Sequence, residues 1–217
     1  MPYVKVCGIC EPAHAAAADV AGADMIGVVH FPHSPRHLDV AAAAHVASAA
    51  GSALVVALVV DADDATLDAF VHQVQPGALQ LHGSETPERG SELAARYGLP
   101  IAKALGVASR SDLAASASYD ALAVFDARPP KGADRPGGHG VPFDWSILDA
   151  APSHYMLSGG LTPQNVGEAV RARRPYAVDV SSGVEAHGRK DPRLIAAFVA
   201  RAKGETAGGS EWALEAV

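Results

Sequence analysis

ALQLHGSETPERGSELAARYGLPIAKA, residues 78–104, holds one complete strand–helix–strand unit, and this unit decides the expected fold. An apolar run from Ala78 to Leu81 is followed by a proline, Pro87, at the expected first position of a helix, where its missing N–H costs no hydrogen bond. The helical pattern continues to Tyr97, and a second apolar run begins at Pro100. Short apolar runs joined by helices are typical of parallel strands that are buried on both faces.

The same alternation of strand and helix repeats eight times along the chain. The expected strands are Tyr3–Cys7, Met25–His30, Leu54–Val60, Ala78–Leu81, Pro100–Ala104, Ala121–Asp126, Tyr155–Leu157 and Ala177–Val180. The expected helices are Pro12–Ala21, Val40–Ala50, Asp63–Val74, Pro87–Tyr97, Arg110–Ser118, Phe143–Asp149, Pro163–Ala172 and Pro192–Lys203. Thr86, Thr162 and Asp191 each precede a proline and are expected N-caps. Eight such units predict an α/β protein, a single (β/α)8 TIM barrel.

Size and composition restrict the possible classes of protein. A chain of 217 residues fits one barrel, which we expect over residues 1–203, with residues 204–217 as a tail outside it. A net charge of −7 argues against nucleic-acid binding. We find no signal sequence and no apolar run of about 20 residues, so we expect a cytoplasmic protein without a membrane segment. Cys7 and Cys10 are best interpreted as a reduced pair, not as a redox or metal motif.

Ionisable side chains end several of the apolar strands, and the C-terminal strand ends carry the active site in such barrels. Cys7 ends the first expected strand and Asp126 the sixth. Lys5 shares the inward face with Cys7, because side chains alternate along a strand, and a lysine there favours the thiolate. The alternatives are that Cys7 is a small buried apolar residue and that Asp126 caps a loop.

Gln80 and His82 also share one face of a strand, and we expect them to form hydrogen bonds to a ligand, although His82 would serve equally as a loop cap. Arg36 follows the second strand in a proline-rich loop and suits bidentate binding of a carboxylate, the alternative being a solvated surface arginine. His30, His33 and His37 lie close together in sequence, but no acidic or cysteine ligand accompanies them, so we expect no metal.

Two glycine-containing loops follow the seventh and eighth expected strands, where this fold usually binds phosphate. They contain Ser158, Gly159 and Gly160 in one case, and Asp179, Ser181, Ser182 and Gly183 in the other. Glycine lets the backbone approach an anion closely, and backbone N–H groups supply positive potential without a cationic side chain. Simple turns are the alternative for each loop alone, but the two at paired positions predict a small phosphorylated substrate.

Taken together, these residues resemble the phosphoribosylanthranilate isomerase family from Val4 to about Lys203. The motifs are Lys5-Val-Cys-Gly-Ile9, Ser34-Pro-Arg36, Gln80-Leu-His-Gly83, Phe125-Asp126, Gly137-Gly-His-Gly140, Phe143-Asp-Trp145, Ser158-Gly-Gly-Leu161 and Val178-Asp-Val-Ser-Ser-Gly-Val-Glu185.

The resemblance implies an Amadori rearrangement without a cofactor, in a monomer or a homodimer. It implies that Asp126 is the general acid, which protonates the furanose ring oxygen, and that Cys7 is the general base, which removes the proton from the second sugar carbon. Arg36 would hold the anthranilate carboxylate, Asp179 a sugar hydroxyl, and the loops with Gly160 and Ser182 the phosphate.

A few positions depart from the family pattern and bear on the pocket lining, not on the expected acid and base. They are Cys10, Val28, His30, Gly106 and His139. Two other functions stay open at this point. One is another sugar-phosphate isomerase on the same barrel, which we expect to use an aspartate where Cys7 stands. The other is a phosphoester-binding barrel without catalysis, against which the presence of Cys7 and Asp126 argues.

Overall fold

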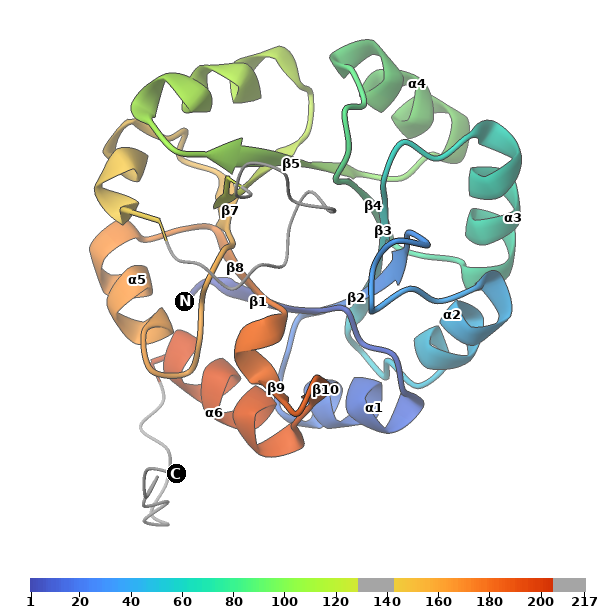
Figure 1. Ribbon diagram of the computed structural model, residues 1–217, viewed down its shortest axis with the longest axis horizontal. Coiled ribbons are helices and arrows are strands. Elements are labelled where there is room, and N and C mark those ends of the chain that lie inside the picture. Colours follow the sequence, from blue (N-terminus) through green and yellow to red (C-terminus); the bar gives the residue numbers. More distant parts are fainter. Residues whose placement is uncertain (129–142, 205–217) are drawn as a thin grey trace.

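The computed structural model describes residues 1–128 and 143–204, and its centre is a closed barrel of eight parallel strands (Figure 1). The strands are β1 (Tyr3–Cys7), β2 (Met25–His30), β3 (Leu54–Val59), β4 (Ala78–Leu81), β5 (Ile101–Val107), β6 (Leu122–Ala127), β7 (Tyr155–Leu157) and β8 (Ala177–Val180). Lys5 of β1 pairs with Met25 of β2 on one side and with Asp179 of β8 on the other, which closes the ring. The predicted TIM barrel is confirmed.

Helices surround the barrel on its outside (Figure 1). They are α1 (Pro12–Val20), α2 (Val40–Ala47), α3 (Asp64–Val74), α4 (Pro87–Tyr97), α5 (Val166–Arg173) and α6 (Pro192–Ala202). After β8 the chain forms a short 3-10 helix, η3 (Ser182–Val184), and a small hairpin of β9 (Glu185–Ala186) and β10 (Arg189–Lys190). None of the described helices has the length and apolar character needed to cross a bilayer. The expected tail, beyond Gly204, lies outside the described residues.

Two of the eight expected helices differ in type from the prediction. The segments after β5 and β6 are 3-10 helices, η1 (Arg110–Ser118) and η2 (Trp145–Ala150). In η1 the hydroxyl of Ser116 donates to the carbonyl of Leu113, a backbone acceptor that α-helical hydrogen bonding would use. Asp112 and Asp144 cap the starts of η1 and η2, where they accept from the backbone N–H of Ser109 and of Ser146.

The N-caps are mostly as expected. Thr86 accepts from the N–H of Arg89, and Asp191 accepts from the N–H of Arg193, which confirms both caps. The prediction that Thr162 caps a helix from Pro163 is wrong, because residues 163–165 form a turn and α5 begins at Val166, after Asn165. The hydroxyl of Thr162 accepts from the N–H of Gln164 within this turn, and its own N–H donates to Asn165 Oδ1.

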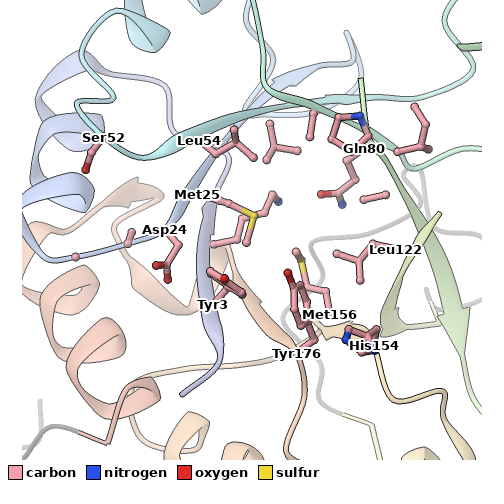
Figure 2. Close-up of a pocket in the computed structure, with 18 of the residues that line it drawn as sticks. Tyr3, Asp24, Met25, Ser52, Leu54, Gln80, Leu122, His154, Met156 and Tyr176 are labelled. Atoms are coloured by element: carbon pink, nitrogen blue, oxygen red, sulfur yellow. The ribbon is translucent and has the colours of Figure 1, made fainter. Parts of the chain in front are cut away.

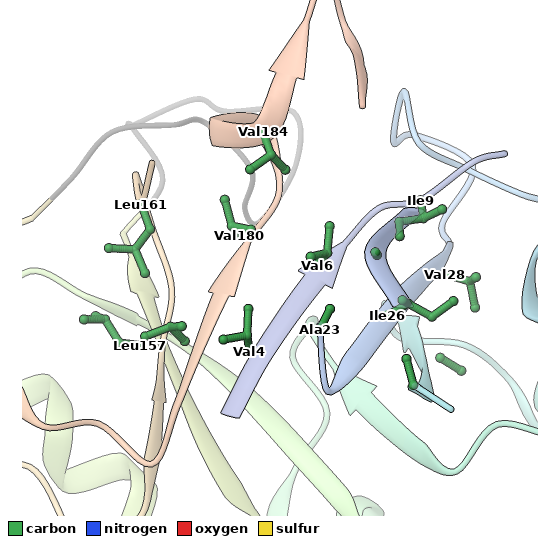
Figure 3. Packing of buried hydrophobic residues seen from close by; sticks show 14 of the residues in the cluster. Val4, Val6, Ile9, Ala23, Ile26, Val28, Leu157, Leu161, Val180 and Val184 are labelled. Atoms are coloured by element: carbon green, nitrogen blue, oxygen red, sulfur yellow. The ribbon is translucent and has the colours of Figure 1, made fainter. Parts of the chain in front are cut away.

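The main apolar core lies between the barrel and the helices. Val4 and Val6 of β1 are fully buried on this face, beside Val180 of β8 (Figure 3). Phe198 and Ile195 of α6 are fully buried as well and belong to the same cluster. Fully burying each such side chain contributes about 1.5–3 kcal/mol. Because strand residues alternate between faces, Lys5 and Cys7 point to the inside of the barrel.

A cavity of about 840 Å³ opens at the N-terminal ends of the strands. Its outer lining includes the first residues of strands, such as Tyr3, Met25 and Leu122, and its inner end reaches Gln80 (Figure 2). Lys5 of β1 also lines it. Two of the lining positions, Ala78 and Ala102, hold alanine, whose small side chain leaves this space open. The cavity therefore lies at the opposite end of the barrel from Cys7 and Asp126.

Candidate active site

The predicted catalytic side chains lie at the C-terminal ends of the strands. Cys7 is the last residue of β1, and Asp126 is the last but one of β6. Because the strands are parallel and form a closed ring, these ends make a single rim, where this fold carries its active sites. Cys7 is 4% exposed and Asp126 is 8% exposed. Cys7 packs with Val29 and Leu58, residues of the next two strands.

Gly27 of β2 makes room for two of these side chains. A Cβ atom at this position would lie 2.7 Å from the sulfur of Cys7 and 3.2 Å from the ammonium nitrogen of Lys5. The charge of Lys5 lowers the pKa of the Cys7 thiol, and the thiolate in turn raises the pKa of Lys5. Lys5 and Cys7 thus act on each other directly, as their shared strand face predicts.

A buried polar network surrounds Lys5. Its ammonium donates to Asp179 Oδ1 at 3.0 Å, and the hydroxyl of Ser158 donates to Asp179 Oδ2 at 3.1 Å. Burial disfavours the charge on Lys5, but the charges of Asp179 and Cys7 outweigh it, so the pKa of Lys5 is raised. The network therefore holds a permanent cation beneath the thiol.

The thiol of Cys7 is nevertheless a weaker acid than a free cysteine. Burial raises its pKa, Lys5 lowers it, and Asp179 raises it again, with a raised pKa as the net result. The position of Lys5 in the sequence predicts a lowered pKa for Cys7, but desolvation depends on the folded barrel and reverses the sign.

His82 links the fourth strand to Asp126. Its Nδ1 lies 3.2 Å from the amide nitrogen of Gln80, and its Nε2 lies 3.7 Å from Asp126 Oδ2. Burial lowers the pKa of His82 to about 4, assisted by the charges of Lys5 and Lys103. The imidazole is therefore neutral at pH 7. The second oxygen of Asp126 accepts from the backbone N–H of Ala127 at 2.8 Å.

Arg36 is held in place by Glu185, an acidic residue for which the sequence predicted no role. Its Nε and Nη2 donate to the two carboxylate oxygens of Glu185 at 2.7 and 2.8 Å. This edge of the guanidinium is therefore already used in a bidentate pair, and the edge formed by Nη1 and Nη2 remains for a ligand. Gly8, at φ +71°, lets the Arg36 side chain pass directly over the backbone.

The two glycine loops lie next to each other. Gly159 and Gly160 both have positive φ, at 84° and 65°, which a residue with a side chain rarely adopts. A Cβ at Gly183 would collide with the carbonyl of Leu161, so the loop after β8 packs against the loop after β7. The close approach of the loops places the N–H groups of both at one corner of the rim.

Lys190 of β10 was missed by sequence reasoning. Its ammonium donates to the carbonyl of Ser181 at 2.9 Å and to Glu185 Oε1 at 2.6 Å. This corner of the rim thus includes a buried cation, which the glycine loops alone do not predict. The only signal in the sequence is one lysine in the segment after the eighth strand, which does not by itself indicate where its side chain lies.

The remaining sequence predictions concern positions around this rim. His30 bonds to the carbonyl of Leu38 and packs against His37. Cys10 donates to the carbonyls of Gly8 and Arg36 at 3.6 Å each. Within residues 1–128 and 143–204, no three His, Cys, Asp or Glu side chains are grouped so as to hold a metal ion.

Val28 is fully buried, and Gly106 pairs with Asp126 across β5 and β6. The motif Gly137-Gly-His-Gly140, with His139, lies outside the described residues.

Comparison with known proteins shows one consistent similarity. Residues 4–201 match the family model described as N-(5'-phosphoribosyl)anthranilate isomerase. A relative of that name from Rhodopseudomonas palustris (strain BisA53) is 54% identical over 207 residues, which cover 92% of this chain and 95% of the relative.

Solved structures show the same similarity. The crystal structure of phosphoribosyl anthranilate isomerase from Thermotoga maritima is 35% identical and superposes with a TM-score of 0.83, over 94% of this chain and all of that one. A second structure of a phosphoribosyl anthranilate isomerase holds reduced 1-(o-carboxyphenylamino)-1-deoxyribulose 5-phosphate. It is 34% identical, with a TM-score of 0.80 over 94% of this chain and all of that one.

Proposed function

This chain belongs to the N-(5'-phosphoribosyl)anthranilate isomerase family, and from that membership we propose how its own residues perform the isomerisation. The enzyme converts N-(5-phosphoribosyl)anthranilate into 1-(2-carboxyphenylamino)-1-deoxyribulose 5-phosphate, a step of tryptophan biosynthesis. The rearrangement is an isomerisation, so no external oxidant or reductant enters the balance.

The substrate carries an anion at each end, and the rim offers a cationic or N–H-rich place for each. The phosphate fits the corner made by Gly159, Gly160 and the Ser181–Gly183 segment, with Lys190 beneath it. The anthranilate carboxylate fits the Nη1 and Nη2 edge of Arg36, while Glu185 keeps the other edge in place. Binding at both ends fixes the ribose between them, which converts the chemistry into an intramolecular step.

Asp126 and Cys7 then act on the ribose in sequence. Asp126 gives its proton to the furanose oxygen, the bond from that oxygen to the first carbon breaks, and the aniline nitrogen forms a cationic Schiff base. Cys7 removes the proton from the second carbon, and the electron pair moves to neutralise the nitrogen as an enolamine. Tautomerisation of the enolamine gives the ketone product. The positive nitrogen lies next to the proton that Cys7 removes and so favours the thiolate at that moment.

One observation carries this assignment: a buried thiol in contact with a lysine and a buried carboxyl in contact with a neutral histidine end two strands at the same rim. Asp179, bonded to Lys5 and Ser158, is the candidate partner for a sugar hydroxyl. The test is the decay of anthranilate-type substrate fluorescence on adding purified protein. Decay is expected with the wild type and not with Cys7→Ala or Asp126→Asn, and unchanged decay with either variant contradicts its role.

The proposal also covers the cellular location and the oligomeric state of the protein. The reduced cysteines Cys7 and Cys10 at the rim favour the cytoplasm, where thiols stay reduced. We expect a monomer or a homodimer, and one of the similar structures is described as monomers generated from dimeric Thermotoga maritima phosphoribosylanthranilate isomerase. Light scattering on the purified protein distinguishes the two states.

A further inference from the structure

Gln80 lies on β4, two residues before His82, which follows the strand, and is 1% exposed. We infer that Gln80 is a positioning residue: by donating its amide N–H to Nδ1 of His82, it holds the imidazole in the tautomer that carries its proton on Nε2, facing Asp126. The kinetic part of this inference rests on the proposed function, because it concerns Asp126 as the general acid. The tautomer itself can be measured without any turnover.

Charged groups on four strands face the imidazole and decide whether it is protonated. Lys5 of β1 and Lys103 of β5 oppose a charge on His82, and burial opposes it most, whereas Asp179 of β8 favours it. Asp126 of β6 is the acidic group nearest to Nε2 among the described residues, at 3.7 Å. A neutral imidazole has one N–H and one lone pair, and the partner on one nitrogen decides which atom has the proton.

The amide of Gln80 supplies that partner. Its nitrogen, a donor, lies 3.2 Å from Nδ1, and in this arrangement Nδ1 accepts and Nε2 carries the proton. Its oxygen has no hydrogen-bond partner among the described residues, and a buried oxygen without a partner destabilises the fold. The amide is therefore poorly explained as a contribution to stability, and the side-chain hydrogen bond that the described residues offer it is the one to His82.

The tautomer matters because Asp126 changes charge during the reaction. When Asp126 has given up its proton, an N–H directed at Oδ2 stabilises the new carboxylate, whereas a lone pair in the same place would oppose it. The distance of 3.7 Å is longer than a formed hydrogen bond, and such contacts often shorten when substrate binds. Gln80 thus sets the acid strength of Asp126 without touching the substrate.

Two variants change the contact in opposite ways. Gln80→Met keeps the length of the side chain and removes the hydrogen-bond donor. Gln80 lies at the inner end of the cavity, which leaves room for the methionine side chain (Figure 2). Gln80→Glu replaces the donor by an acceptor, which favours a proton on Nδ1. Leu122→Met is the matched control, because Leu122 lines the same cavity and has no part in the proposed mechanism.

The direct test is ¹⁵N NMR of protein labelled at histidine, with the His82 signals assigned by their loss in His82→Asn. In the wild type at neutral pH we expect Nε2 to carry the proton and Nδ1 to be bare. We expect a mixture of tautomers in Gln80→Met, a proton on Nδ1 in Gln80→Glu and no change in Leu122→Met. A wild-type His82 with its proton on Nδ1, or an unchanged tautomer in Gln80→Met, would overturn the inference.

The kinetic test separates positioning from simple packing. We expect kcat of Gln80→Met to fall about 10- to 100-fold, the loss of a hydrogen bond to a charged group, with KM within about threefold. The high-pH limb of kcat should move to higher pH, because a carboxylate without the N–H is less stabilised. Wild-type kcat and an unmoved limb in Gln80→Met contradict the inference. If the wild type itself lacks isomerase activity, the proposed function is wrong. The NMR experiment still tests the role of Gln80 in that case, because it measures the His82 tautomer without turnover.

Discussion

Lys5 and Asp179 form a buried ion pair between the first and the last strand of the barrel, with a nitrogen–oxygen distance of 3.0 Å. The pair lies one layer below Cys7 and keeps Lys5 charged beside the thiol. The same ion pair thus connects β1 with β8, which closes the barrel, and influences the pKa of Cys7.

Replacing Lys5 by Met is expected to damage both stability and catalysis. It leaves Asp179 buried without its cation, which costs about 3–5 kcal/mol of the free energy of unfolding. It also removes a charge that lowers the pKa of Cys7, so the low-pH limb of kcat should move to higher pH. Urea unfolding and a pH–rate profile check the two effects. The double variant Lys5→Met/Asp179→Asn should recover part of the stability and none of the activity, and full recovery of activity would contradict the role of Lys5.

Replacing Cys7 by Ser should abolish most of the turnover and little of the binding. A serine hydroxyl has almost the same size, but it is a far weaker base than a thiolate. We expect kcat to fall about 10²- to 10⁴-fold, with KM within a few-fold, because the lost interaction belongs to the transition state. Steady-state kinetics checks this, with Cys10→Ser as the control that keeps near-normal kcat. Wild-type turnover in Cys7→Ser would exclude Cys7 as the base.

Replacing Arg36 by Ala should mainly weaken binding of the aromatic end of the substrate. One charge-assisted contact contributes about 1.5–3 kcal/mol, so Kd for a product analogue with the anthranilate carboxylate should rise about 10- to 100-fold. Calorimetric titration measures it, and an analogue without the carboxylate is the control, whose Kd should change little. Equal losses for both analogues would show that Arg36 acts on the loop, not on the carboxylate.

The lowered pKa of His82 predicts that the free energy of unfolding depends on pH. Its pKa is lowered from 6.5 to about 4 in the folded protein, so between these values the unfolded chain binds more protons. Stability is therefore lost as the pH falls from 6.5 toward 4, by up to about 3 kcal/mol. Urea unfolding at pH 7 and pH 4.5 measures the loss. His82→Asn should show a smaller loss over the same interval, and an equal loss would assign the effect to other groups.

The barrel could be predicted from sequence because its signal is local. A strand that is buried on both faces, such as Val4–Val6, is a short apolar run, and the residue that ends it at the rim is the one placed in the site. Cys7, Asp126 and His82 could therefore be found from the strand ends alone. The roles that they are given remain proposals.

What could not be predicted depends on contacts between distant segments. Glu185 meets Arg36 across 149 positions of the chain, and no spacing rule indicates such a pair. Lys190 reaches Ser181 only because β9 and β10 fold back over the rim. The raised pKa of Cys7 depends on how completely the barrel excludes water, which is a property of the whole fold. Helical periodicity also does not distinguish a 3-10 helix from an α-helix over segments as short as η1 and η2.

The cavity at the N-terminal ends of the strands makes the enzyme a suitable scaffold for engineering. Its lining, with Ala78 and Ala102, accepts larger apolar side chains at the end of the barrel away from Cys7 and Asp126. Filling this empty volume raises heat resistance. The inner end of the cavity is lined by Lys5 and Gln80, and Ala102 pairs with Gln80 across β4 and β5, so substitutions there also reach the residues that position the reacting groups. Heat resistance and turnover can therefore be changed separately only at the outer lining.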